Sequence, residues 1–393
     1  MPILLLSAIF ANVFTIGFVW FDIYLWREWY LHKDLVQPEY GQEYAQHCLI
    51  GAIAILVLFA LGKIVIRSLF SGSGKGMQDE PVAERYPEQY QLQRPDGSII
   101  NIEQGGVKGK QAIIFIHGWN SNSMQWYYQK KYFEKDYHLI LMDHAGLGKS
   151  KRPDNKDYSL EKLAADLNAV IDYSNVKDPI LWGHSMGGFT ILTFCRVYFN
   201  KMDRIKGIIL EHTTYTNPTK TSIMSGLLQA IQNPVLKPIC WIMIGLSPLL
   251  WISRWMSYLN GSSLIMTRLL TFAGTQTAKQ LDFTALLSTM APPAITGRGV
   301  LGMFEYDATE VLSQINIPTL VIGADKDRLT KLEASITMNE RIHGSQLLVL
   351  SSAGHMGFVE QHRHVNAVAG KFLNFKPNNA DQVIANERTP QKV

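Results

Sequence analysis

Two long apolar stretches near the N-terminus dominate the hydrophobic pattern of the chain. The first, 3–21, has the length needed to cross a hydrocarbon core of about 30 Å. An aromatic cluster typical of membrane interfaces follows it, namely Trp20, Tyr24, Trp26, Trp29 and Tyr30. The second, 48–66, is interrupted only by Lys63, whose long side chain we expect to extend toward the interface. The pattern predicts a transmembrane helical hairpin within residues 1–70.

The first stretch differs from a cleaved signal peptide, because no Lys or Arg precedes it and no small-residue cleavage site follows. Basic residues gather at or after the end of the second stretch, namely Lys63, Arg67, Lys75 and Arg85. The connecting loop holds Arg27 and Lys33. This bias favours a cytoplasmic C-terminal part. We therefore expect an integral membrane protein of a bacterial-type inner membrane or an equivalent one.

Beyond residue 70 the pattern changes to that of a folded α/β domain. Residues 71–87 are rich in Gly, Ser and charge and predict a linker. Two β-like runs around Pro95-Asp96-Gly97 then predict a hairpin. Short apolar runs alternate with helical patterns, the runs being QAIIFIHG, YHLILMDHAG, PILWGHS, GIILEH and TLVIGAD. This alternation predicts a mostly parallel, doubly wound sheet with helices on both faces.

Residues 214–306 interrupt the alternation with helical patterns. The uncharged segment 238–253 at their centre is short for a membrane span, and Pro248 interrupts it. Its apolar side chains are too numerous for one face of one helix. We therefore predict a core domain built from 88–213 and 307–375, a helical insert at 214–306, and a flexible polar tail at 376–393.

Composition narrows the possible functions. Of the 393 residues, 47% are hydrophobic and 18% charged, and the net charge is +4 without any basic block interleaved with aromatics, so nucleic acid is not an expected partner. The three cysteines, Cys48, Cys195 and Cys240, each lie in an apolar run, which indicates reduced, buried thiols.

Metal and phosphate sites are not expected either. His362 and His364 are interpreted as solvent-facing residues of a helix rather than metal ligands. GLGKS is not a phosphate loop, because Asp143 stands where glycine would be needed. Asp143 and His144 more simply shape the turn after a strand. We expect no metal and no cofactor.

Chemically reactive residue types follow the predicted strands. Ser185 stands in G-H-S-M-G between a strand and a helix, where Gly183 and Gly187 permit a sharp turn. A serine hydroxyl needs a base and an orienting acid to become a nucleophile. His355, in SSAGHMGFVE, and a carboxylate of GADKDRLT follow later strands, in the chain order Ser, Asp, His.

Five motifs in order, IHGWN, DHAGLGKS, GHSMGG, GADKDRLT and GHMGFVE, resemble the α/β-hydrolase superfamily. The resemblance covers about residues 88 to 375 and is strongest to membrane-anchored lipases and esterases, including monoacylglycerol-lipase-like proteins. It implies an α/β-hydrolase fold in which the insert at 214–306 forms a lid over the serine.

The resemblance also implies residue roles. Ser185 matches the nucleophile, His355 the general base, and the backbone N–H groups of Trp119 and Met186 the oxyanion donors. The acid matches Asp327, which stands directly before the x-L-T step, although Lys331 replaces the proline usual after it. Asp325 and Glu211 are alternative acids.

The implied function is hydrolysis of carboxylic esters of lipophilic substrates, such as a monoacylglycerol or lysolipid, by a serine hydrolase. An acyltransferase or thioesterase with the same triad, or a non-catalytic lipid-binding protein, are alternatives. Epoxide hydrolases and dehalogenases share the fold but need Asp where Ser185 stands. The expected partners are a lipophilic ester and the bilayer, whereas chain-length preference and oligomeric state do not follow from the sequence.

Overall fold

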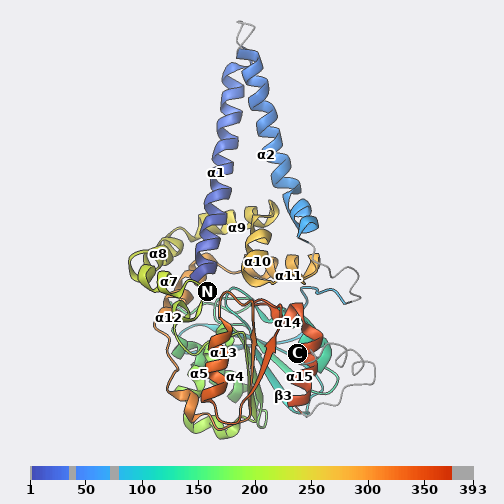
Figure 1. Ribbon diagram of the computed structural model, residues 1–393, viewed down its shortest axis with the longest axis vertical. Helices are drawn as coiled ribbons and strands as arrows, with labels where there is room; N and C mark the ends of the chain where they lie inside the picture. The colour runs from blue at the N-terminus through green and yellow to red at the C-terminus, as the bar shows by residue number, and fades with distance from the viewer. Residues whose placement is uncertain (1, 35–40, 71–78, 374–393) are drawn as a thin grey trace, which may run out of the picture.

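Three parts are stacked along the long axis of the molecule: a helical hairpin, a layer of short helices, and a sheet covered by helices (Figure 1). The computed structural model describes residues 2–34, 41–70 and 79–373. The predicted tail at 376–393 and residues 71–78 of the predicted linker lie outside this description.

The hairpin consists of α1 (Pro2–His32) and α2 (Gly41–Leu69), which contain the two apolar stretches of the sequence. The helices pack closely, since a Cβ on Gly51 would lie 3.1 Å from Cδ1 of Leu25. Among the described helices, α2 is long and apolar enough to cross a membrane by itself. The pairing of the two helices is therefore observed, whereas the crossing of a membrane by both stays a prediction.

The core sheet has eight strands in the order β1-β2-β4-β3-β5-β6-β7-β8. The pairs β1–β2 and β2–β4 are antiparallel and all the others are parallel, as the alternation of runs predicts. The strands are β1 (Glu88–Gln93), β2 (Ile99–Gly106), β3 (Ala112–Ile116), β4 (His138–Met142), β5 (Ile180–His184), β6 (Gly207–Glu211), β7 (Thr319–Ala324) and β8 (Gln346–Leu350).

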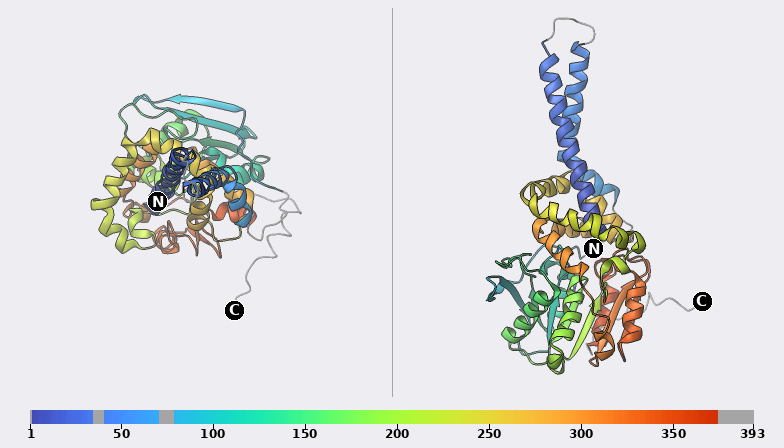
Figure 2. Two further views of the ribbon diagram at one scale, coloured as in Figure 1. Left: turned by 90° about the horizontal axis from the view of Figure 1, so that it is seen from above. Right: turned by 90° about the vertical axis from the view of Figure 1, so that its left-hand side faces the viewer.

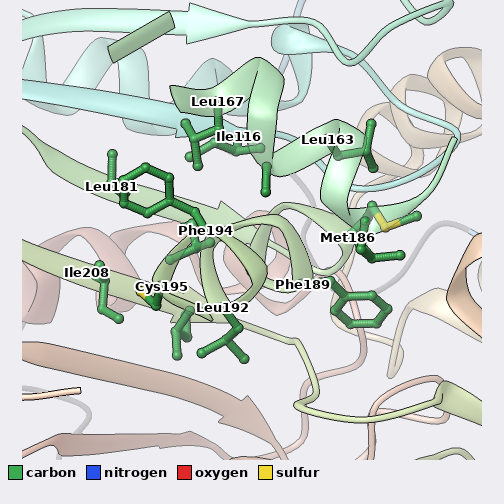
Figure 3. Close-up of a cluster of buried hydrophobic side chains, with 14 of the residues drawn as sticks. Ile116, Leu163, Leu167, Leu181, Met186, Phe189, Leu192, Phe194, Cys195 and Ile208 are labelled. Carbon is green, nitrogen blue, oxygen red and sulfur yellow. The ribbon is translucent and has the colours of Figure 1, made fainter. Parts of the chain in front are cut away.

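Every residue of β3, β4, β5 and β6 is buried, because helices cover both faces of the sheet. Alternate residues of each strand enter two separate cores. Figure 3 shows part of one core, where Ile116, Leu181 and Ile208 of the sheet meet α4 (Leu160–Ser174) and α5 (Met186–Val197). The other core receives α3 (Tyr127–Phe133) and α15 (His362–Phe372). Short helices α13 (Leu332–Arg341) and α14 (Gly357–Glu360) complete the domain.

The helical insert, called the lid below and predicted at 214–306, lies between the hairpin and the sheet (Figure 2). Its helices are α6 (Pro218–Thr221), α7 (Ser225–Ile231), α8 (Lys237–Gly245), α9 (Ser247–Leu259), α10 (Ser262–Thr271), α11 (Ala278–Thr289) and α12 (Pro293–Phe304). The segments Ser225–Gly245 and Ser247–Leu259 meet at 94°. Pro248 stands in the first turn of α9, so the predicted interruption coincides with the start of a helix.

The described part of the hairpin contacts the lid helices α9, α10 and α11. Lys63 of α2 places Nζ 2.9 Å from a carboxylate oxygen of Asp282 on α11 and 2.5 Å from the hydroxyl of Tyr258 on α9. The ammonium of Lys63, predicted to extend outward toward an interface, thus has a carboxylate of the lid as its partner.

The second half of the predicted linker is bound to the core domain. The guanidinium of Arg85 is 2.9 Å from a carboxylate oxygen of Asp143 and also pairs with Glu103. Tyr86 donates its hydroxyl hydrogen to Glu134 at 2.9 Å. The folded domain thus begins several residues before β1, which the charged composition of this segment hides.

Candidate active site

Ser185 occupies a strained turn between β5 and α5. Its φ is 52° and its ψ is −114°, values that a residue with a side chain adopts only when the surroundings impose them. A Cβ on Gly183 would lie 2.5 Å from the carbonyl carbon of Gly187, and one on Gly187 would lie 2.0 Å from the carbonyl oxygen of Ile116. The two glycines flanking the serine are therefore required by close backbone contact, as the motif predicts.

Three side chains from separate loops meet at this turn. Oγ of Ser185 is 3.0 Å from Nε2 of His355, and Nδ1 of His355 is 2.8 Å from Oδ2 of Asp327. Ser185 follows β5, Asp327 follows β7 and His355 follows β8, at the carboxyl ends of parallel strands. The structure thus brings together the three residues that the sequence singles out, in hydrogen-bonded order.

Asp327 is held ionised by its surroundings. Burial alone raises the pKa of this carboxyl, but the imidazole of His355 and hydrogen bonds outweigh burial and lower the pKa to about 2. Its Oδ1 accepts hydrogen bonds from the backbone N–H groups of Leu329 and Thr330, at 2.8 and 3.0 Å. Oδ2 accepts another from the Thr330 hydroxyl at 2.8 Å. A permanently charged Asp327 is suited to orient His355.

The two alternative carboxylates lie elsewhere. Asp325 is exposed, and its carboxylate is 3.9 Å from the ammonium of Lys326. Glu211 is buried and accepts a hydrogen bond from Nε1 of Trp182 at 2.9 Å. Burial raises the pKa of Glu211 to about 8 despite this bond, so the group is mostly protonated at neutral pH. Geometry and charge both favour Asp327 as the partner of His355.

The residues predicted to bind an oxyanion flank the serine. Trp119 follows β3, and Met186 is the first residue of α5, whose N–H has no acceptor within the helix. The loop at Gly118 lies against the turn, since a Cβ there would be 3.4 Å from Cβ of Ser185. Within the described parts of the chain neither amide donates a hydrogen bond to protein. Both amides are thus available, and their catalytic role stays a prediction.

Two supporting residues were not singled out from the sequence. His184 places Nε2 3.1 Å from the carbonyl oxygen of His355 and so links the turn to the loop of the base. His117 accepts a hydrogen bond from the backbone N–H of His144 at 3.0 Å, and burial lowers its pKa to about 3, which keeps the ring neutral. The sequence signal that could have identified His184 is its position directly before Ser185 in the motif.

Asp143 shapes the loops beneath the site, as predicted. Its carboxylate accepts hydrogen bonds from the backbone N–H groups of Ser123 at 2.8 Å and Lys149 at 2.9 Å. It therefore ties the loop after β3 to the turn after β4.

The lid covers the serine. Ser185 has no exposed surface, and Trp119 donates its Nε1 hydrogen to the carbonyl oxygen of Thr296 on α12 at 3.2 Å. The Thr296 hydroxyl donates to the side chain of Asn120 at 2.7 Å. Gly299 packs against the Trp119 ring, where a Cβ would lie 1.9 Å from Cζ2. In this closed arrangement the lid rests directly on the predicted oxyanion loop.

The environment of His362 differs from the solvent-facing one that the sequence predicts. The residue is buried, and its ring stacks on Tyr128 with centroids 3.6 Å apart, instead of facing solvent. Its helix α15 packs against α3, and this tertiary contact is not visible in the local pattern. Within the described residues no group of three His, Cys, Asp or Glu side chains is arranged to hold a metal ion.

The sequence and the fold agree with a known family. The sequence profile of the alpha/beta hydrolase fold matches residues 111–361, more than half of the chain. The chain therefore belongs to the α/β-hydrolase superfamily.

Relatives in this superfamily include esterases and lipases. Lipase 1 of Psychrobacter immobilis is 22% identical over 285 residues, covering 67% of this chain and 76% of the lipase. An esterase structure from Exiguobacterium antarcticum is similar with a TM-score of 0.59 and 23% identity, covering 72% of this chain and 98% of the esterase. A membrane phospholipase A structure, described as a bacterial virulence factor, is similar with a TM-score of 0.54 and 17% identity. The similarity covers 84% of this chain and 98% of the phospholipase. These structural similarities establish the common fold.

Proposed function

We propose that the protein is a serine hydrolase that cleaves carboxylic esters of lipophilic substrates. The observation that carries the proposal is the continuous hydrogen-bonded arrangement of Ser185, His355 and Asp327 on a strained strand-to-helix turn. A turn serine of merely structural use would not need a buried imidazole at 3.0 Å backed by an ionised carboxylate.

Acylation follows from the hydrogen-bond order. Nε2 of His355 accepts the hydroxyl proton of Ser185 while Oγ attacks the ester carbonyl carbon. Asp327 accepts the Nδ1 hydrogen bond of His355 and stabilises the imidazolium that forms. The imidazolium then donates its proton to the leaving alcohol, and the acyl group remains on Ser185.

The negative oxygen of the tetrahedral intermediate is stabilised by the backbone N–H groups of Trp119 and Met186, which are free to donate. Water, deprotonated by Nε2 of His355, then attacks the acyl carbonyl carbon. The bond between this carbon and Oγ of Ser185 breaks, the imidazolium returns its proton to Oγ, and the acid leaves. Because the site is buried under α12, these hydrogen bonds act in a medium of low dielectric constant, where they are stronger than in water.

The surroundings of the site support the proposed substrate class. The lid exposes apolar side chains on α8 and α9, and α2 is long and apolar enough to span a bilayer. With α1 and α2 as a membrane anchor, the protein lies next to a membrane that contains esters such as monoacylglycerols and lysolipids. The names of the relatives, a lipase, an esterase and a membrane phospholipase A, support this class. The positive residues after α2 favour the core domain on the cytoplasmic side.

Labelling with a fluorophosphonate probe tests the nucleophile. We expect the full chain in detergent to be labelled and Ser185→Ala to lose the label, while Ser351→Ala, at an exposed turn, keeps it. Undiminished labelling of folded Ser185→Ala would contradict the proposal. Product analysis with a long-chain monoacylglycerol should yield free fatty acid, whereas a new ester formed with an added alcohol would indicate an acyltransferase.

A further inference from the structure

The lid touches the hairpin within its two apolar stretches rather than beyond them. The hydroxyls of Thr15 on α1 and Ser257 on α9 are 2.9 Å apart and buried. On α2, a Cβ at Gly62 would lie 2.4 Å from the carbonyl oxygen of Asn260, directly after α9. Thr15 belongs to the stretch 3–21 and Gly62 to 48–66. Helix α9 therefore lies at the level of residues that are expected in hydrocarbon.

The part of the hairpin between this contact and its tip is too charged to fill a bilayer alone. The uncharged part of α2 there is 44–61, roughly 27 Å at about 1.5 Å per residue, and Glu43 directly precedes it. On α1 it ends after Phe21, roughly 9 Å beyond Thr15. A hydrocarbon core of about 30 Å placed wholly above the lid would enclose Asp22, Arg27, Glu28 and Glu43. Charges in hydrocarbon are strongly unfavourable, so the core must extend down to the lid.

The outer surface of the lid is suited to this depth. From Pro238 to Leu259 the only charged residue is Arg254, which is buried and donates hydrogen bonds to Ala291 and Thr296 inside the lid. The outward side chains are apolar and each 49–59% exposed, namely Trp241, Ile242, Leu246, Leu249, Ile252 and Leu259. An uncharged apolar surface of this kind beside a membrane anchor is typical of contact with lipid.

We propose that α8 and α9 lie within the membrane leaflet nearer to the core domain, beside the lower part of the hairpin. Figures 1 and 2 show the hairpin rising out of the lid, with the sheet on the opposite side. The inference rests on the membrane anchorage proposed above and adds the depth of the lid to it. Lys63, although within the second stretch, is then shielded by Asp282 and Tyr258 rather than exposed to hydrocarbon.

At this depth the lid connects the leaflet with the loops of the site through a chain of hydrogen bonds. The same α9 that contacts the hairpin also carries Arg254, which bonds to Thr296 on α12, and Thr296 contacts the loop of Trp119 beside Ser185. A lipid ester in the leaflet then meets the lid without its acyl chain passing through water.

Fluorescent labels at single introduced cysteines measure the depth. The full chain in phospholipid vesicles is labelled with an environment-sensitive dye at Ile252→Cys on α9, Leu58→Cys on α2 or Val349→Cys on β8, all exposed sites. The native cysteines are buried. We expect blue-shifted emission, quenched by lipids brominated on the acyl chain, at positions 252 and 58, and neither effect at 349.

Two results would overturn the inference in different ways. If position 58 is quenched and position 252 behaves like 349, the lid lies outside the leaflet while the membrane anchor stands. If position 58 is also unquenched, the anchor itself is wrong and the depth inference fails with it. Neither result bears on the labelling of Ser185.

Activity provides an independent measurement. Ile252→Lys places a charge at the proposed depth, and Ile336→Lys places one on exposed α13 of the core domain. We expect the ratio of activity on a long-chain monoacylglycerol in vesicles to activity on a soluble short-chain ester to fall about tenfold for Ile252→Lys. The ratio should not change for Ile336→Lys. An unchanged ratio in Ile252→Lys would contradict the proposal. If Ile252→Lys loses activity on both substrates, the quenching of the fluorescent labels at positions 252, 58 and 349 decides whether the lid lies in the leaflet.

Discussion

At the scale of single residues, burial gives two carboxylic acids opposite properties. Asp327 is buried but surrounded by donors and by His355, and its pKa falls to about 2. Glu211 is equally buried, has one donor in Trp182, and its pKa rises to about 8. The number of hydrogen bonds and charges facing the group therefore decides whether burial leaves it ionised.

Asp327→Asn tests the orienting role. The amide cannot stabilise the imidazolium and favours the wrong tautomer of His355, so we expect kcat to fall about 10³–10⁴-fold while the fold persists. Steady-state kinetics on a soluble short-chain ester measures this. Asp325→Asn, at the neighbouring exposed position, is the control and should retain activity. Equal losses in the two variants would contradict the assignment of the acid.

Glu211 makes stability depend on pH. The pKa is about 8 in the folded chain and 4.5 when unperturbed, so the folded state binds an extra proton between these values. Its stabilising contribution is complete below about pH 4.5 and is lost as pH rises through 8. We expect the free energy of unfolding of Glu211→Gln to decline less steeply with pH than that of the unsubstituted protein. The contribution of Glu211 to this slope is at most about 1.4 kcal/mol per pH unit. Thermal unfolding at pH 5 to 8 measures this difference. Parallel curves of stability against pH for the unsubstituted protein and Glu211→Gln would contradict the role of Glu211.

At the scale of elements, the turn between β5 and α5 depends on glycines that the sequence already marks. The pattern also predicts the strands and the order of the loops, because apolar runs and glycine turns are local signals. It does not predict that Lys63 pairs with Asp282 or that His362 stacks on Tyr128. Those contacts join residues far apart in the chain, and local periodicity contains no information about them.

Gly187→Ala tests the close approach at this turn. The added Cβ would lie 2.0 Å from a backbone oxygen of β3, so the strand and α5 must separate, and we expect a loss of about 3 kcal/mol or more in stability. The matched control is Gly226→Ala in α7, where nothing lies within 4 Å and alanine should be neutral or slightly stabilising. Denaturant unfolding in detergent compares them. Equal stability of the two variants would mean that the turn is not tightly packed.

At the scale of the whole molecule, the hairpin, lid and sheet form a continuous stack in which the lid has two packed sides. One side rests on the loop of Trp119, and the other receives α1 and α2. Ala11, Ala45, Cys48 and Ala52 of the hairpin are buried, the last completely. The hairpin is thus part of the packed structure as well as a proposed anchor.

Removing residues 1–78 tests this integration. We expect the truncated chain to expose the surfaces of α9, α10 and α11 that now contact the hairpin, and to require detergent to remain monomeric. Gel filtration with and without detergent, compared with the full chain, measures this. A truncated chain that is monomeric and active in plain buffer would show that the hairpin contacts contribute little to the lid.

The sequence by itself determined the membrane-like stretches, the alternation of strands and helices, the presence of a helical insert, and the chain order of Ser185, a following carboxylate and His355. These features depend on local periodicity, glycine placement and motif order, which a linear chain displays directly. Only the tertiary structure decided which carboxylate faces His355, what neutralises Lys63, and at what level the lid meets the hairpin. The reason is that burial and pairing energies depend on neighbours brought together by packing, and those neighbours are distant in sequence.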